Sequence, residues 1–551
     1  MKKNFNRYAR YYAAILALGF AAATSACGSS TEIGNDKSEV AESTEKADQD
    51  IVETDDVEQA DDTSGNADDT SGNADDTSDK EDADKADDTD DTSDEKDGKK
   101  SDKTDSSSDE DSDASENDDA SDSSEKEVET SSVTSSGYIS KDDISVNETI
   151  EDSSDGGHAI QADGQSAEYS NIEVVKTGDS SGDEADFYGE NAAIFATNGG
   201  TLDLSEIIVE TDGAHANGVF SYGEGTTVNI SDSVIETSGN CSGGLMTTGG
   251  GTMNATNLTI HTTGNSSAAI RSDRGGGTVT VTGGSYTTEG TGSPAIYSTA
   301  DITVNDASLT STASQGVVVE GQNSVTLNDV TLVADNNKKN SDKSAYYQAV
   351  MIYQSMSGDA DEGTAAFSMD GGSITNKNGD IFFVNNTVAT ISLTDVDITN
   401  EDSEGIFLRA EAAGWGTEGS NGGNVTLNAS DQEINGDIVV DDVSSLNLYL
   451  ADASTFEGAI NSDGQAGQVY VELSDGSTWT LTADSYISSL TCETDSINLN
   501  GYTLYVDGAA YTEGSESSGT VIESASTSSG EGSQHSDNGH GDGKPSGKPG
   551  E

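Results

Sequence analysis

The chain has 551 residues, of which 103 are acidic and 24 are Lys or Arg, and its formal net charge at pH 7 is −79. This charge excludes direct binding to nucleic acid or to anionic lipid, because both need basic side chains to displace counterions. Neutral or cationic partners, or anionic partners bridged by divalent cations, fit the composition.

Residues 1–26 have the pattern of a secretory signal peptide. Basic residues stand near the start, and residues 11–23 form an apolar run too short to span a bilayer. The run ends in Thr24-Ser25-Ala26-Cys27, which resembles the lipobox of bacterial lipoproteins, with Thr24 where leucine is usual. The resemblance implies acylation of Cys27, and a protein anchored to the outer face of the cytoplasmic membrane of a Gram-positive bacterium. An ordinary cleaved signal peptide is the alternative.

Residues 27–136 are predicted to form a disordered stalk. Residues 31–130 hold 41 acidic and nine basic side chains, and no aromatic residue lies between Phe20 and Tyr138. Such a segment cannot bury enough apolar surface to offset its chain entropy, and its like charges keep it extended. We expect a tether across a thick cell wall, or a solubilising linker. Residues 513–551, rich in Gly and Ser, are predicted to form a second disordered tail.

Residues 137–512 repeat themselves about every 25 residues. The recurring unit is a small residue, an aliphatic residue and a variable residue, and a second unit alternates apolar residues with Thr, Asn or Ser. The aliphatic positions of the first unit are Ile194, Val219, Leu245, Ile270, Ile296, Val317, Val350, Ile381 and Ile406. Short alternating runs separated by Gly, Asn and Asp predict strands. Their repetition predicts an all-β solenoid, a parallel β-helix of about twelve rungs with aliphatic columns inside.

Several repeats are similar in sequence to a known group of proteins. The segments are Gly178–Phe187, Gly213–Gly218, Met246–Thr252 and Ala269–Gly277. They resemble adhesin-like and, more loosely, carbohydrate-binding surface lipoproteins of Firmicutes, within the right-handed parallel β-helix (pectate-lyase-like) superfamily. The resemblance covers about residues 137–511 and implies right-handed coils. Because the superfamily hosts binding proteins and enzymes alike, it leaves the function open.

The variable residue of each repeat is expected to point outward, since side chains alternate across a strand. These positions are Phe195, Phe220, Met246, Arg271, Tyr297, Val318, Met351, Phe382 and Phe407. We call this set the aromatic stripe. If it is exposed, it predicts a stacking platform for a sugar chain. The alternative is that the insertions at residues 334–348, 354–366 and 409–424 cover the stripe as a second core.

Two groups of charged residues are further candidates for ligand binding. Arg271 and Arg274 predict an anion or uronate contact through bidentate hydrogen bonds, unless Asp273 neutralises them within a turn. The insertion between two rungs carries four acids that form a candidate Ca²⁺ site, although their spacing is not that of an EF-hand. These acids are Asp179, Asp183, Glu184 and Asp186.

The remaining cysteines, Cys241 and Cys492, are predicted to be unpaired core thiols, because an elongated fold keeps positions so distant in sequence apart. No Ser-His-Asp, metal-ligand or phosphate-loop signature appears. We predict a monomeric, non-catalytic, adhesin-like surface protein that binds a polysaccharide or glycan on a fibre, a host or a neighbouring cell, with no nucleic-acid partner. The alternatives are a cell-surface polysaccharide lyase or polygalacturonase-like hydrolase, and a wall-spanning scaffold without a specific ligand.

Overall fold

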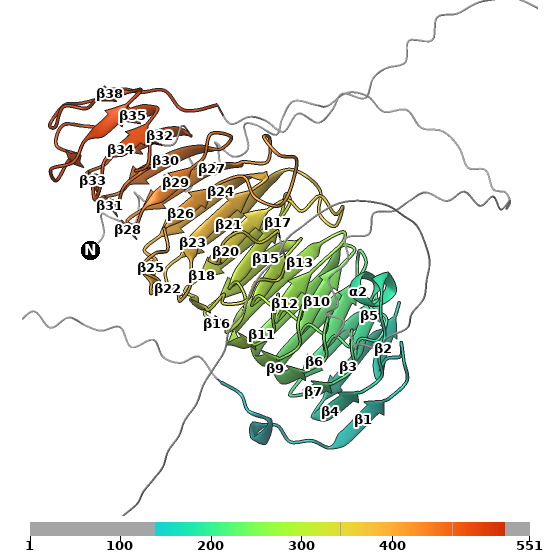
Figure 1. Ribbon diagram of the computed structural model, residues 1–551. Coiled ribbons are helices and arrows are strands. Elements are labelled where there is room, and N and C mark those ends of the chain that lie inside the picture. The colour runs from blue at the N-terminus through green and yellow to red at the C-terminus, as the bar shows by residue number, and fades with distance from the viewer. Residues whose placement is uncertain (1–137, 342, 465–466, 524–551) are drawn as a thin grey trace, which may run out of the picture. The chain divides into compact units, whose positions relative to one another are not determined.

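The computed structural model describes residues 138–341, 343–464 and 467–523, and nearly all regular structure in these ranges is β-strand (Figure 1). A six-residue helix, α2 (Asp183–Tyr188), and a 3-10 helix, η1 (Lys141–Asp143), are the exceptions there. The strands stack coil upon coil in a parallel β-helix, as the repeat predicts, and the coils are right-handed, as the resemblance implies. The predicted signal peptide, Cys27, the stalk and residues 524–551 lie outside the described residues.

Each typical coil places one strand on each of three sides. The first side is an eleven-stranded parallel sheet, in agreement with the expected number of rungs. It consists of β2 (Ile160–Asp163), β5 (Ile194–Thr197), β8 (Val219–Tyr222), β10 (Leu245–Thr248), β12 (Ile270–Ser272), β14 (Ile296–Ser298), β17 (Val317–Glu320), β20 (Gln348–Tyr353), β23 (Asp380–Asn385), β26 (Leu408–Ala410) and β29 (Ile438–Val440).

The second side, which we call the long ribbon, continues the coil after a turn. It consists of β3 (Ser166–Ser170), β6 (Thr201–Ser205), β9 (Thr227–Thr237), β11 (Gly251–Thr262), β13 (Gly277–Thr288), β15 (Asp301–Asn305), β18 (Ser324–Asn328), β21 (Thr364–Asp370), β24 (Thr387–Thr394), β27 (Gly423–Ser430), β30 (Ser445–Ala451), β32 (Gln468–Leu473) and β35 (Ser489–Thr491). Its strands pair in parallel from coil to coil.

The third side, the short ribbon, is joined to the long ribbon because β9, β11 and β13 run through both. It consists of β1 (Glu148–Asp152), β4 (Ile172–Lys176), β7 (Ile208–Thr211), the C-terminal halves of β9, β11 and β13, β16 (Ser308–Ser311), β19 (Thr331–Ala334), β22 (Ser373–Asn376) and β25 (Asp397–Asn400). Together the two ribbons form one twenty-stranded sheet.

The last coils use two small sheets. One contains β28 (Glu433–Asn435), β31 (Thr455–Glu457), β33 (Thr478–Thr480) and β36 (Ile497–Asn498), and the other contains β34 (Ser485–Ile487), β37 (Leu504–Val506) and β38 (Ala509–Ala510). The final pair, β37 and β38, is antiparallel. Residues 513–523, assigned to the tail by the sequence, are described and contact this end: Ser517 pairs with Cys492, and the Ile522 amide donates to Asn447 Oδ1 at 3.0 Å.

The corner between the two ribbons is made by a single residue with positive φ in most coils, and by two consecutive glycines in the coils of Gly283 and Gly371. Along the stack this position holds Glu206, Asp232, Asn257, Gly283, Asp306, Asp329, Gly371 and Asp395. All but one are Asp, Asn or Gly, the residues that tolerate the left-handed region best. The recurring Asp, Asn and Gly of the repeat therefore set the bend of each coil.

The corner that leads back to the eleven-stranded sheet depends on glycines that lie directly over one another. A Cβ on Gly239 would lie 1.9 Å from the carbonyl oxygen of Gly213, and a Cβ on Gly264 would lie 1.8 Å from that of Gly239. Gly290 stands in the same relation to Gly264. Only glycine allows the backbones of successive turns to approach this closely.

The inside of the coils is filled by one continuous apolar core. The predicted aliphatic positions from Ile194 to Val350 pair one to the next and are buried, as the repeat predicts. Aromatic rings join this core farther along, where Phe382 makes edge-to-face contacts with Phe367 and Phe407. Cys241 and Cys492 are both buried and free, as predicted.

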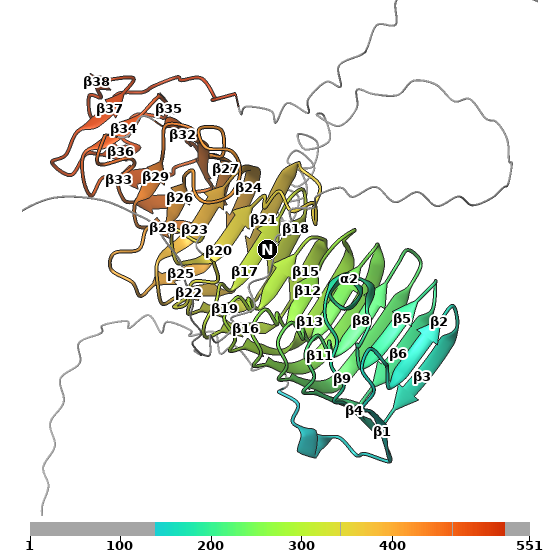
Figure 2. The ribbon, with the colours of Figure 1, turned by 45° about the vertical axis from the view of Figure 1, so that its right-hand side comes forward.

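A segment before β1 lies on the outside of the coils (Figure 1, Figure 2). Residues 138–147, which we call the strap, run along the short ribbon. Ile139 and Ile144 pack against Ile208 and Val234, and the Ile139 amide donates to Thr259 Oγ1 at 3.2 Å. The first described residues are therefore attached to the side of the solenoid.

Candidate functional site

The aromatic stripe is not a solvent-exposed platform, so that prediction is wrong. Phe195 retains 6% of its exposure and Phe220 none, and both pack with Met246 in a small apolar cluster on the outer side of the eleven-stranded sheet. Residues 178–192, including α2, cover this cluster: Tyr188 contacts Tyr222 edge-on, and Thr248 Oγ1 donates to the Phe187 carbonyl at 2.7 Å.

The stripe is also out of register at its far end. Val350 pairs with Phe382 rather than with Ile381, and Phe382 pairs with Leu408. Phe382 therefore faces the main core, with 0% exposure. Phe407, which immediately precedes β26, is also buried there, with 1% exposure and an edge-to-face contact with Phe382. The outward position on these strands belongs to Phe383 and its neighbour Arg409. A shift of one residue exchanges the two faces of a strand.

Insertions cover the second half of the stripe. Val318, Met351 and Phe383 are buried in another apolar cluster, to which Tyr346, Ala413 and Trp415 contribute. The Trp415 ring lies 5.1 Å from that of Tyr353, and the Tyr346 ring lies 5.5 Å from that of Phe383. Two of the insertions named from the sequence supply these rings. The alternative of a second core is thus the one that the structure supports.

Between the two clusters the outward side chains are polar, and they form hydrogen bonds or ion pairs with other groups of the chain. Arg271 donates from Nε and Nη2 to the buried carboxylate of Asp273 at 3.1 and 2.8 Å, which is the neutralised turn given above as the alternative. The Tyr297 hydroxyl donates to Glu320, and Tyr353 donates to the same carboxylate at 3.1 Å. Burial raises the pKa of Tyr297 well above its usual range, and the charge of Glu320 adds to this.

Arg274 links two segments that lie over the eleven-stranded sheet, helix α2 and the insertion at residues 354–366. Its guanidinium pairs with Asp183 of α2 at 2.9 Å and with Asp359 of the 354–366 insertion at 2.5 Å, and it stacks 3.8 Å over the ring of Phe187. Both arginines predicted to bind an anion are therefore paired with carboxylates of the chain itself.

The four acids predicted to bind Ca²⁺ do not converge. Asp179 Oδ1 accepts the Ala214 amide at 2.8 Å, Asp183 pairs with Arg274, and Glu184 is exposed. Asp186 instead accepts a hydrogen bond from His215, 2.7 Å from Nδ1, near the sulfur of Cys241. Short helix α2 sends successive acids in different directions, which the sequence spacing alone does not reveal.

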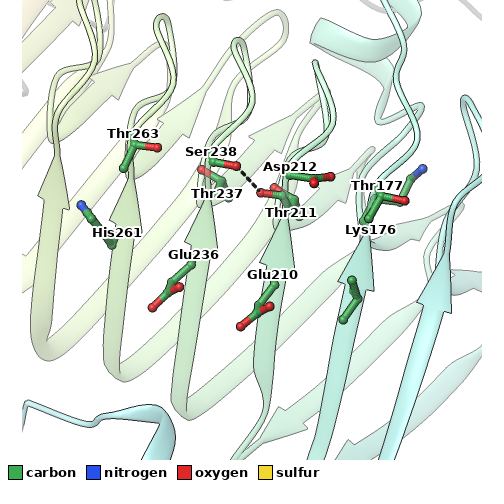
Figure 3. Close-up of a pocket in the computed structure, with 11 residues that line it drawn as sticks. Lys176, Thr177, Glu210, Thr211, Asp212, Glu236, Thr237, Ser238, His261 and Thr263 are labelled. Carbon is green, nitrogen blue, oxygen red and sulfur yellow. Dashed lines mark hydrogen bonds between the residues drawn. The ribbon is translucent and has the colours of Figure 1, made fainter.

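An open groove of about 390 Å³ lies on the outer side of the short ribbon (Figure 3). Glu210, Glu236 and His261 occupy the same outward position on successive coils. Such positions lie about 4.8 Å apart. The turns that follow these strands form the other wall of the groove with Thr177, Asp212, Ser238 and Thr263. The groove thus presents carboxylates, an imidazole and hydroxyls at coil spacing.

The strap reaches into this groove. Lys141 Nζ contacts Glu210 and lies 2.6 Å from a carboxylate oxygen of Glu236. Burial lowers the pKa of Lys141, but the hydrogen bonds and charges of the two glutamates outweigh it and leave the pKa raised. His261 Nε2 lies 2.9 Å from Glu289. A second hollow of about 240 Å³, walled by residues 138–141, shares Glu236 and His261 with the first.

Sequence reasoning missed the groove residues. Glu210, Glu236 and His261 are separated by 26 and 25 residues, which is the spacing of the repeat itself. Testing every polar position for recurrence at that period, and not only the positions next to the aliphatic column, would have found them.

Comparisons with known proteins add little to this picture. No family model and no curated protein matches the chain. A chain of the cryo-EM structure of the Vag8–C1 inhibitor complex matches with a TM-score of 0.33 and 15% identity, over 65% of this chain and 100% of that chain. The fold assignment rests on the strand pairing described above. In the described part of the chain, no helix has the length and apolar character needed to cross a membrane.

Proposed function

We propose that this protein is a non-catalytic binding protein of the cell surface, and that the short-ribbon groove holds a polysaccharide. The observation that carries the proposal is the recurrence of Glu210, Glu236 and His261 on successive coils, facing a wall of turn hydroxyls. Carboxylates and hydroxyls accept and donate the hydrogen bonds that sugar hydroxyls offer. A site built from stacked coils repeats along its length, as a polysaccharide does.

The electrostatics of the groove favour a neutral or cationic sugar chain. Residues 131–551 contain 62 acidic and 11 basic side chains, and Glu210, Glu236 and Asp212 line the groove itself. An anionic polymer would be repelled unless divalent cations bridged it. A chain of amino sugars or of neutral sugars therefore suits this site better than a uronate polymer, which the paired Arg271 and Arg274 do not favour either.

The proposal includes the cellular setting that the sequence indicates. A signal peptide, an acylated Cys27 and an acidic stalk would place the β-helix outside a Gram-positive cell, anchored through lipid and held away from the membrane. This setting rests on the lipobox pattern at Cys27 and on the acidic composition of residues 31–130. The partner would then be a glycan on a fibre, on a host or on a neighbouring cell.

One observation favours a second candidate, a polysaccharide lyase or hydrolase. Acidic and basic side chains meet in the groove, where Lys141 touches both Glu210 and Glu236 and His261 lies on the next coil. Paired carboxylates are the catalytic groups of glycoside hydrolases. Here Lys141 forms ion pairs with both carboxylates, an arrangement that suits binding better than proton donation.

The test is co-sedimentation of the full-length chain with insoluble polysaccharides, together with affinity electrophoresis on soluble ones. Glu236→Gln is expected to weaken binding about tenfold, because it removes a charged acceptor. Glu168→Gln makes the same change at an exposed position of the long ribbon and is expected to bind normally. Lys141→Met separates an effect of the strap from an effect of the carboxylates.

Three outcomes contradict the proposal. Equal loss of binding in the two glutamine variants would move the site away from the groove. Release of oligosaccharides that depends on Glu236 would show the enzyme instead. Absence of binding to every polysaccharide, neutral, cationic and anionic, would favour the wall-spanning scaffold.

A further inference from the structure

His215 and Cys241 occupy the same place in two successive turns. Both have positive φ, 55° and 56°, and Ser266 continues the series at 55°. The His215 amide donates to Asn240 and the Cys241 amide donates to Asn265, so each turn is bonded to the next at the position beside the side chain. Residues stacked in this way lie about 4.8 Å apart, with side chains pointing the same way.

The backbone that carries these two side chains has little freedom to shift. The stacked glycines, Gly213, Gly239 and Gly264, fix the distance between turns. Buried serines add a second tie: the Ala216 amide donates to Ser242 Oγ, and the Ser242 amide donates to Ser267 Oγ, each at 2.9 Å. The separation of the imidazole and the thiol is therefore set by the coils and not by a mobile loop.

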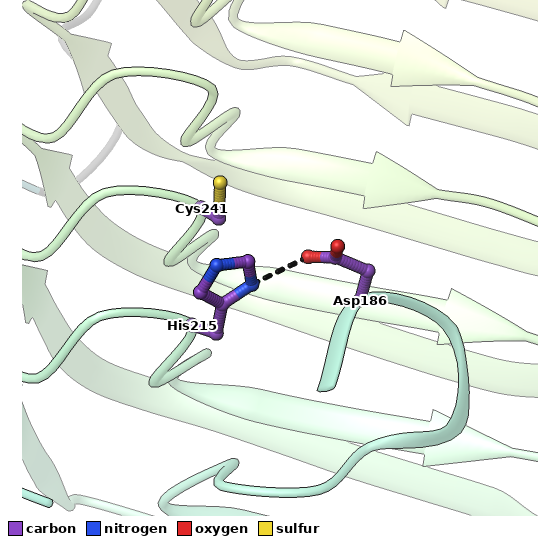
Figure 4. A group of neighbouring side chains, drawn as sticks. All are labelled: Asp186, His215 and Cys241. Atoms are coloured by element: carbon purple, nitrogen blue, oxygen red, sulfur yellow. Dashed lines mark hydrogen bonds and ion pairs between the residues drawn. The ribbon is translucent and has the colours of Figure 1, made fainter. Parts of the chain in front are cut away.

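A third potential metal ligand comes from helix α2, which lies over these turns. Asp186 of α2 lies against His215, with 2.7 Å between Oδ1 and Nδ1. Figure 4 shows the Cys241 sulfur and the Asp186 carboxylate both close to the imidazole ring. The helix is held in place by the hydrogen bond from Thr248 to Phe187 and by the ion pair of Asp183 with Arg274.

The three side chains offer one thiol, one imidazole and one carboxylate, and their ligand atoms all lie within 4.8 Å of one another. Atoms that share a tetrahedral zinc ion at ordinary bond lengths lie roughly 3.3–3.6 Å apart, so a pair at the 4.8 Å limit has to approach by about 1.2–1.5 Å to share one ion. All three are shielded, since the side chains of His215 and Asp186 keep 13% and 14% of their exposure and Cys241 keeps 9%.

We propose that Asp186, His215 and Cys241 form a binding site for Zn²⁺, with a fourth position left for water or an external ligand. The mixture of sulfur, nitrogen and oxygen donors suits zinc and related transition metals and does not suit Ca²⁺ or Mg²⁺, which take oxygen ligands. Arg271 of β12 pairs with Asp273 at 2.8 Å, and its charge also interacts with Asp186 and Cys241. The site is separate from the short-ribbon groove and does not depend on the proposed function.

The test uses the full-length chain carrying Cys27→Ser and Cys492→Ser, so that Cys241 is the sole thiol. Apoprotein is titrated with Co²⁺ and then with Zn²⁺ in competition with a chelator. We expect one tight equivalent, a thiolate-to-cobalt charge-transfer band that Zn²⁺ abolishes, and a higher melting temperature with Zn²⁺. The charge-transfer band distinguishes this site from weak binding to the many carboxylates of the chain.

Two variants complete the test. Cys241→Ser should remove the charge-transfer band and weaken Zn²⁺ binding at least about tenfold, and it is expected to fold because Ser266 fills the same position in the next coil. Asp186→Asn should also weaken binding, whereas Glu184→Gln, an exposed neighbour on the same helix, should not. Zn²⁺ affinity that is unchanged in Cys241→Ser, or the lack of any tight equivalent, would overturn the proposal.

Discussion

The outer side of the eleven-stranded sheet and the outer side of the long ribbon follow the same alternation but meet different surroundings. On the sheet, Phe220, Met246 and Phe383 lie under helix α2 and under insertions, and form a second set of apolar clusters. On the long ribbon the corresponding positions are Thr, Asn, Ser and Asp in contact with water, as where Asn254 donates to Asn229 and Asn229 donates to Asp203. Alternation identifies the side of a strand that faces the core, but it does not say whether the other side is exposed.

The two sides differ in where extra residues are inserted into the coils. Insertions enter between the short ribbon and the eleven-stranded sheet, or directly after a strand of that sheet, and fold back over it. The passage from the long to the short ribbon takes a single left-handed residue in most coils and carries no insertion. The strap and residues 519–522 cover only parts of the two ribbons. The groove proposed to bind a ligand therefore lies on the side without insertions, and the apolar clusters under the insertions are expected to contribute mainly to stability.

The largest expected effect tests this division by truncation. Phe383→Ala should lower the free energy of unfolding by about 3–5 kcal/mol, because it leaves a cavity between the sheet and its cover. Thr278→Ala, at an exposed outward position of the long ribbon, should change it by less than about 0.5 kcal/mol. Urea unfolding followed by circular dichroism measures both. Similar midpoints for the two variants would mean that the cover is not a second core.

A smaller effect on stability is expected when the link between helix α2 and the 354–366 insertion is removed. Arg274→Met keeps the length of the side chain but removes its pairs with Asp183 and Asp359, and should cost about 1 kcal/mol. Limited proteolysis should then cut within residues 178–192 faster than in the unaltered chain. Lys377→Met, which removes the charge of an exposed lysine, is the matched control. Unchanged cleavage would show that α2 is held by its apolar contacts alone.

A pH dependence is expected from His158, which stacks on Phe195 at the edge of the covered sheet, 4.7 Å between ring centres. Burial lowers the pKa of His158 below 6.5. The unfolded chain therefore takes up the proton first as the pH falls, so this residue makes the folded state less stable below about pH 6.5. His158→Phe should flatten the fall in stability between pH 7 and pH 5. An equally steep fall in the variant would assign it to other groups.

The smallest effect concerns the strap on the ribbon side. Lys141→Met removes two partly exposed ion pairs and should cost only about 0.5 kcal/mol at low salt. The difference should vanish in high salt, because screening weakens exposed pairs. A larger loss that persists in high salt would show that the strap is part of the stable core, and would weaken the contrast between the two sides.

The sequence predicts the coils well where its repeat is clean. Ile194 to Ile296 recur at 25 or 26 residues, and each falls on its predicted partner. The predicted register is wrong at residues 380–385. Ile381, Phe382 and Phe383 are all apolar, so the sequence does not show which of them face the core. The turns were equally predictable, since Asp, Asn or Gly marks every corner between the ribbons named above except that of Glu206.

The sites were less predictable, for physical reasons. Burial of the aromatic stripe depends on where insertions fold back, and their contacts, such as Trp415 with Tyr353, are irregular and absent from the repeat. The meeting of His215 with Cys241 was accessible, because both stand four residues before the aliphatic position of their coils, Val219 and Leu245. The arrival of Asp186 was not, since it depends on the path of α2.

The strap also determines how a mechanical load reaches the solenoid. Residues 1–137 join the described chain at Tyr138, which lies beside Ser285 on the flank of the coils, and not at β1. A pull through that connection would peel the strap, loading Ile139, Lys141 and Ile144 one after another, instead of shearing a whole strand pair at once. Ten released residues have an extended length of at most about 33–36 Å, so the slack gained is this length minus the distance that the strap already spans. Under the proposed anchoring through residues 1–137, a load would therefore act on the strap before it acts on the first coil.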